Sequence, residues 1–228
     1  MQMKEIKTIF EQIVLGEPSG SELIDALEQR LVPLIPSMLD ALLNDTEEMK
    51  TLANRSSMHA NGFVKIELHQ FLNYKLRLHY FSLSAEEAIH DHTWNFASAI
   101  LAGKLRSERF AVVRSNTPDS IYLKRYVYRP RVGKGNTVLI KLHGYANLKS
   151  VGIDTYAAGS SYWLDGSVPH RVLATSKQCV TLVITTDRKR ATNYIFSFKA
   201  FPKELEVKSI SLEQLEDALN VIRKLVKS

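Results

Sequence analysis

Cysteine is almost absent from this chain: Cys179 is the only one in 228 residues. It cannot form an internal disulfide, and its apolar neighbours favour a small buried hydrophobic residue. The chain also lacks any run of roughly 18 apolar residues, which excludes a membrane-spanning helix and gives no reason to expect a membrane partner. Its first residues lack the apolar core of a signal peptide. These absences predict a cytoplasmic protein in a cell that keeps its thiols reduced.

Positive charge is in small excess: 30 lysine and arginine residues against 24 aspartate and glutamate residues give a net charge of +6. The densest basic stretch is residues 124–134, where tyrosine alternates with arginine as in some proteins that bind single-stranded nucleic acid. An exposed strand and turn gives the same pattern, and no nucleic-acid-binding signature accompanies it. We therefore expect no nucleic-acid partner.

Helical spacing of apolar residues is confined to the two ends of the chain. Residues 4–54 show it in segments separated by glycine and proline. Ser19 with Glu22, and Ser211 with Gln214, have the spacing of capping boxes that begin helices. These helices would pack on the rest of the protein, cover an open sheet edge or form a homodimer interface.

The middle of the chain consists of short β-rich runs, many of them separated by turn signals, and this spacing predicts a sandwich or barrel. We expect one structural domain in three parts: an N-terminal helical segment over 1–58, a barrel over 59–200 and a C-terminal helix over 201–228. The expected strands are 63–68, 74–83, 90–101, 105–114, 120–128, 136–142, 160–164, 170–174, 179–185 and 192–198.

A pair of histidines, His90 and His92, is the strongest chemical signal. Residues two apart on an extended strand point to the same side, so both imidazoles can bind one metal ion. His170, which follows a turn and begins another expected strand, would be a third ligand. Asp91 points to the opposite face and is expected to hydrogen-bond to backbone or neighbours. Three neutral imidazoles with open positions make a site that can act on a substrate.

Two further residues are alternatives for the ligand set. Glu108 follows Gly103 on the return strand of the first expected hairpin, where it would supply a carboxylate or pair with a nearby arginine. His143 ends a strand-like run before a glycine, but it lacks the loop-to-strand setting of His170. His79 alternates with apolar residues and is expected to have a structural role, with a hydrogen bond to a metal ligand as the alternative.

These residues resemble the two metal motifs of the cupin superfamily. The glutamate of the usual first motif falls on Phe96 or Ala97, so the ligand set resembles the three-histidine thiol dioxygenases, of which cysteine dioxygenase is best known. The resemblance covers about residues 60–200 and implies a mainly β cupin double-stranded β-helix, a jelly-roll barrel, with Fe(II), O₂ and a small-molecule substrate. The matching residues are His90, His92 and Gly103, then Gly159, Gly166 and His170.

The chain also departs from cysteine dioxygenases, which carry a cysteine after the histidine pair, cross-linked to a tyrosine on a late strand. Here residues 94–97 contain no cysteine and Thr185 stands near the tyrosine position, so cysteine is not the expected substrate. Trp94, Phe96, Tyr162 and Trp163 would surround the pocket. Candidate anchors for an anionic substrate are Arg77, Arg109 and Arg171, with Lys65 as a further cation.

The sequence thus predicts a metal-dependent dioxygenase that acts on a small anionic molecule. A neutral ligand set leaves the metal with its full +2 charge, which favours an anionic donor. Imidazole also suits Zn, Ni, Mn and Cu, so the ligands alone do not select Fe(II). The alternatives are a non-catalytic cupin that binds or senses a small molecule, and a metal-dependent isomerase or hydrolase.

Overall fold

The structure is a computed structural model that describes residues 3–59, 62–82, 88–115, 117–130 and 137–227. The predicted fold class, mainly β with helices at both ends, is confirmed. None of the described helices is long and apolar enough to cross a membrane.

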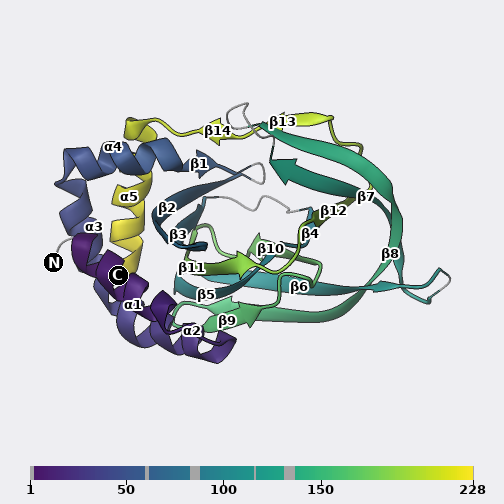
Figure 1. The fold of residues 1–228 in the computed structure, drawn as a ribbon, viewed down its shortest axis with the longest axis horizontal. Coiled ribbons are helices and arrows are strands. Elements are labelled where there is room, and N and C mark those ends of the chain that lie inside the picture. Colours follow the sequence, from purple (N-terminus) through teal and green to yellow (C-terminus); the bar gives the residue numbers. More distant parts are fainter. Residues whose placement is uncertain (1–2, 60–61, 83–87, 116, 131–136, 228) are drawn as a thin grey trace.

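The helices from the two ends of the chain pack together on one side of the molecule (Figure 1). Ser19 and Glu22 form the predicted capping box, and the Ser211 and Gln214 side chains each accept a hydrogen bond from the other residue's backbone N–H. The helices are α1 (Met3–Leu15), α2 (Gly20–Ala26), α3 (Ile35–Leu43), α4 (Thr46–Arg55) and α5 (Leu212–Lys227), with a π-helical turn η1 (Leu27–Leu31) and a 3₁₀ turn η2 (Val32–Leu34) between α2 and α3.

The first sheet lies next to the helices, and its paired strands are antiparallel. Its order is β14-β1-β2-β3-β11-β5-β9. The strands are β1 (Ser57–Met58), β2 (Phe63–Phe71), β3 (Tyr74–Phe81), β5 (Trp94–Ala102), β9 (Ser161–Leu164), β11 (Cys179–Arg188) and β14 (Lys208–Ser209).

The second sheet is also antiparallel, with the order β13-β8-β6-β10-β4-β12-β7. Because β7 pairs with β8 as well, six of these strands close into a ring. The strands are β4 (Ile89–His90), β6 (Lys104–Val113), β7 (Ile121–Pro130), β8 (Thr137–Ala157), β10 (His170–Ala174), β12 (Asn193–Ser197) and β13 (Glu204–Glu206).

Strand β3 has an apolar face toward the helices and a polar face toward the second sheet. Leu76, Leu78 and Tyr80 are buried in the cluster that also contains the apolar helix faces. A fully buried leucine side chain stabilises the folded state by about 2 kcal/mol, which fixes this face against the helices. Arg77 and His79 alternate to the opposite face, toward the second sheet. The helical layer therefore determines which polar side chains enter the space between the sheets.

Several strands differ from the sequence prediction, and the main differences are these. The expected strand over 90–101 is interrupted between β4 and β5, so the two histidines do not share one strand. The expected strand over 136–142 is the first part of the 21-residue β8, which continues because β6 and β7 pair along it with register shifts near Gly144 and Gly152. Two short strands, β13 and β14, precede the C-terminal helix. The turn expected near residue 134 lies outside the described residues.

Candidate metal centre

The three predicted histidines come together between the two sheets. His90 ends β4 and His170 begins β10, where the two are register partners on neighbouring strands. His92 follows in the connection to β5. The ring centroids are 4.8 Å apart for His90 and His92, 4.7 Å for His90 and His170, and 5.1 Å for His92 and His170. The candidate ligand atoms of all three lie within 4.8 Å of one another.

The hydrogen bonds of this histidine group leave nitrogen lone pairs available for a metal. Nδ1 of His90 lies 2.9 Å from the Ala88 carbonyl oxygen, and Nδ1 of His170 lies 2.9 Å from that of Val168. A ring nitrogen beside a carbonyl carries the proton and donates it, so Nε2 of each ring keeps its lone pair. The donor set therefore fits a transition metal.

Two of the three histidines are held in the neutral form that binds metals. Burial, with a smaller contribution from the nearby His90, lowers the pKa of His170 to about 3. Burial also lowers the pKa of His92 well below its usual value, and His90 and His170 add to this effect. At neutral pH these imidazoles carry no charge, so no proton has to leave before a metal binds.

Aromatic side chains wall the histidine group. Trp94 stacks on His92 with ring centroids 5.2 Å apart, and Phe96 lies 5.5 Å from His92 and 5.7 Å from His170. Tyr162 follows, 5.9 Å from Phe96. The expectation that Trp163 also surrounds the pocket is wrong.

Trp163 neighbours Tyr162 on β9, so its side chain points to the other face. There it packs against the cluster that includes the helices. A Cβ added to Gly20 would lie 2.8 Å from its indole ring.

Arg77 is the predicted anchor that lies beside the histidine group. Its guanidinium carbon is 5.8 Å from the centroid of the Trp94 ring, which in turn covers His92. The side chain is largely buried, and Nη2 lies 3.4 Å from a Glu67 carboxylate oxygen. Its Nε is buried and has no hydrogen-bond partner among the described residues.

Lys65 reaches the same region from β2. It is the register partner of His79, and one residue pair separates these two from the pair of Glu67 and Arg77. Burial, and then the charge of Arg77, lower the pKa of Lys65 to about 8. Lys75 and Arg77 both pair with Glu67, at 2.9 and 3.4 Å. Lys65 lies on the same face of β2, so the described residues place three cations around one carboxylate there.

The other two predicted anchors are engaged elsewhere. Arg109 donates to Asp154 at 2.7 Å, and its side chain is 44% exposed. Arg171 lies 2.8 Å from the buried Glu108 carboxylate. Arg171 follows His170 on β10 and therefore points to the opposite face of the strand.

The residues considered as alternative metal ligands lie outside the histidine group. Glu108 is used by Arg171, and it does not belong to the histidine group. His143 lies within β8 rather than at a strand end, and its ring is 5.5 Å from that of Tyr194. Asp91 accepts a hydrogen bond from the Tyr194 backbone at 2.6 Å, as expected of a residue that points away from the site.

Two further histidines lie near the group, and His59 had no functional signal in the sequence. His59 stacks on Phe63 with centroids 4.3 Å apart, and burial, then the charges of Lys65 and His90, lower the pKa of His59 to about 3. The His79 ring centroid lies 5.0 Å from that of Phe63, and Nε2 of His79 is buried without a hydrogen-bond partner among the described residues. Only the alternation along β3 places His79 on the interior face.

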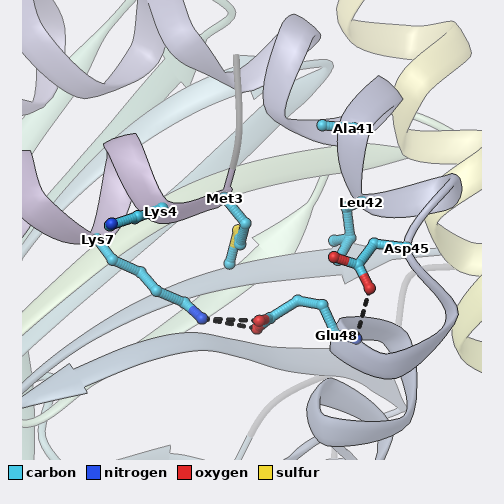
Figure 2. Close-up of a pocket in the computed structure, with 7 residues that line it drawn as sticks. All are labelled: Met3, Lys4, Lys7, Ala41, Leu42, Asp45 and Glu48. Atoms are coloured by element: carbon cyan, nitrogen blue, oxygen red, sulfur yellow. Dashed lines mark hydrogen bonds and ion pairs between the residues drawn. The ribbon is translucent and has the colours of Figure 1, made fainter.

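A separate hollow of about 390 Å³ lies in the helical layer (Figure 2). Three of its charged residues interact with one another. Lys7 pairs with Glu48 at 2.8 Å, and the Asp45 side chain accepts a hydrogen bond from the Glu48 backbone N–H at the start of α4. The hollow is therefore a feature of helix packing. It is lined by Met3, Lys4, Lys7, Ala41, Leu42, Asp45 and Glu48.

No family model matches the sequence, and no curated protein matches it. Solved structures do match. A cupin superfamily protein from Desulfitobacterium hafniense is 10% identical, with a TM-score of 0.33 over 59% of this chain and 85% of that one. A hydroquinone 1,2-dioxygenase is 17% identical, with a TM-score of 0.33 over 54% and 63% of the two chains. An oxalate decarboxylase from Bacillus subtilis is 14% identical, with a TM-score of 0.36 over 59% and 28%. With similarity this distant, the function has to be argued from the site.

Proposed function

We propose that this protein is a metal-dependent dioxygenase, similar to thiol dioxygenases, that uses Fe(II) and O₂ to oxidise a small anionic molecule. The observation that carries the proposal is the histidine group: three imidazoles from two separate segments, with Nε2 of His90 and His170 left free by their backbone hydrogen bonds. A structural site commonly has four protein ligands, whereas three leave room for substrate.

The histidines and the aromatic residues around them would have separate roles. His90, His92 and His170 would hold the ion, and when bound, Fe(II) would supply open positions and the redox chemistry with O₂. Trp94 and Phe96 cover the histidine group and would keep bulk water from the reacting groups. Zn, Ni, Mn and Cu also bind imidazole, so the choice of Fe(II) is the part of the proposal that rests on the resemblance alone.

The anionic character of the substrate follows from the charges around the histidine group. The metal would keep its +2 charge because its ligands are neutral, and Lys65, Lys75 and Arg77 exceed the one nearby carboxylate, Glu67. Arg77 is buried with an Nε that lacks a hydrogen-bond partner among the described residues, which costs free energy that an anionic ligand would recover. A guanidinium can bind both oxygens of a carboxylate, so Arg77 is the proposed anchor.

Metal content and oxygen consumption test this proposal together. The protein would be purified anaerobically, its metals measured, and O₂ uptake followed with a panel of thiols and diketones. We expect about one iron per chain and O₂ uptake with at least one compound. Tight metal binding without O₂ uptake would favour the non-catalytic binding module. Failure to bind any of the five candidate metals would overturn the proposal.

A further inference from the structure

The buried Asp91 and the half-buried Arg190 form an ion pair on the far side of the segment that carries His90 and His92. The Asp91 side chain lies between His90 and His92 in the sequence but on the opposite face, and the residue is only 3% exposed. Its carboxylate is 3.2 Å from Nη2 of Arg190 and accepts the Tyr194 backbone N–H. The arginine compensates part of the cost of burying this carboxylate.

The Arg190 guanidinium also connects the two segments that carry the histidines. Its Nη2 donates to the His92 carbonyl oxygen and, at 3.0 Å, to the Gly166 carbonyl oxygen. Gly166 lies in the turn that leads into His170. The same two segments meet directly, because the His92 backbone N–H donates to the Gly166 carbonyl oxygen at 2.7 Å.

Gly166 shows how closely these segments approach. A Cβ added there would lie 2.0 Å from the Trp94 carbonyl oxygen and 3.0 Å from that of His92, so no side chain fits without moving one segment. The Gly166 N–H donates to Asn95 Oδ1 at 2.9 Å. Arg190 donates to two carbonyl oxygens at this contact, one from each segment, those of His92 and Gly166.

We propose that Arg190, held by Asp91, is a positioning residue that fixes the distance between the His90–His92 segment and the turn before His170. The inference rests on the proposed function for the metal itself. Groups that orient metal ligands from behind typically change metal affinity 10–100-fold when removed. The competing explanation is that Arg190 only neutralises Asp91.

Metal titration of Arg190→Ala tests the inference, with Co(II) as the probe because its visible absorption reports ligand geometry. We expect Co(II) to bind about 10–100-fold more weakly, and guanidinium ion in the buffer to restore part of the affinity. Arg188→Ala is the matched control, since Arg188 is exposed at the end of β11. It should bind Co(II) like the wild type. Unchanged affinity of Arg190→Ala would overturn the inference.

Two more variants separate positioning from neutralisation. In Asp91→Asn/Arg190→Ala no buried carboxylate needs a cation, yet we expect Co(II) binding to stay weak. Affinity equal to wild type would show that Arg190 only neutralises Asp91. Arg190→Lys, for use if Arg190→Ala does not fold, keeps the charge but lacks the fork that spans carboxylate and carbonyls. It should also bind weakly, and wild-type affinity in it would contradict positioning. If the wild type itself bound no Co(II) or other metal, the proposed function would fail and take this inference with it.

Discussion

His90 and His170 face each other as register partners on neighbouring antiparallel strands, with ring centroids 4.7 Å apart. They are 80 positions apart in the chain, yet each ring makes the same contact: its Nδ1 lies 2.9 Å from the carbonyl oxygen two residues earlier. The backbone thus orients both rings in the same way. Such preorientation lowers the cost of assembling a metal site.

Replacing His170 by alanine should remove most of the bound metal. Two imidazoles bind a metal ion far more weakly than three, while β10 stays paired with β6 through backbone hydrogen bonds. Metal content after dialysis, with circular dichroism to confirm the fold, measures this. His143→Ala is the control, because His143 lies outside the histidine group, and it should retain full metal content. Full occupancy in His170→Ala would place the site elsewhere.

Replacing Arg77 by leucine should raise the Michaelis constant for the substrate about 10-fold or more, with little effect on metal content. A hydrogen bond to a charged group contributes about 1.5–3 kcal/mol, and this one is expected to form with the substrate anion. Steady-state kinetics of the metal-loaded protein measure it. Arg109→Leu removes an arginine that is paired with Asp154, and it should leave the Michaelis constant unchanged. Equal effects of the two substitutions would contradict an anchor role for Arg77.

The pH dependence of kcat/KM should reflect the loss of the Lys65 charge. Its folded-state pKa is about 8, so the side chain is charged below that pH and loses its charge above it. If that charge attracts an anionic substrate, kcat/KM should fall as the pH rises through about 8. Lys65→Arg keeps its charge over this range and should remove the alkaline limb. An alkaline limb that persists unchanged in Lys65→Arg would assign it to another group.

Cysteine should be a poor substrate. The segment after His92 contains no cysteine, and Thr185 is buried on β11 near the position where cysteine dioxygenases have a tyrosine. Assays with cysteine should give little O₂ uptake compared with the best compound of the panel. Efficient formation of cysteine sulfinate would show that these two departures have no bearing on the substrate.

The sequence was sufficient to predict the features that have a local pattern. β-rich runs between turn signals predicted most strands and capping residues predicted two helix starts. The sequence motifs around His90, His92 and His170, which resemble those of cupins, predicted the histidine group. The prediction that Cys179 is buried is confirmed. Each of these depends on neighbours a few residues away.

Partner choice over long distances could not be predicted in the same way. Arg77 and Arg171 are both arginines on expected strands, and only the fold shows that one lies beside Trp94 while the other pairs with Glu108. Arg190 gave no signal at all, because its partners come from two other segments. The length of β8 depends on two flanking strands rather than on its own composition.

X-ray absorption at the iron edge of the anaerobically loaded protein distinguishes a three-histidine centre from any other iron site. We expect three imidazole nitrogens at about 2.0–2.2 Å from one iron, with oxygen atoms of water or substrate completing the shell. The imidazole signal should be lost in the variant with all three histidines replaced by alanine. Iron without imidazole scattering, or an unchanged spectrum in that variant, would contradict a three-histidine metal centre.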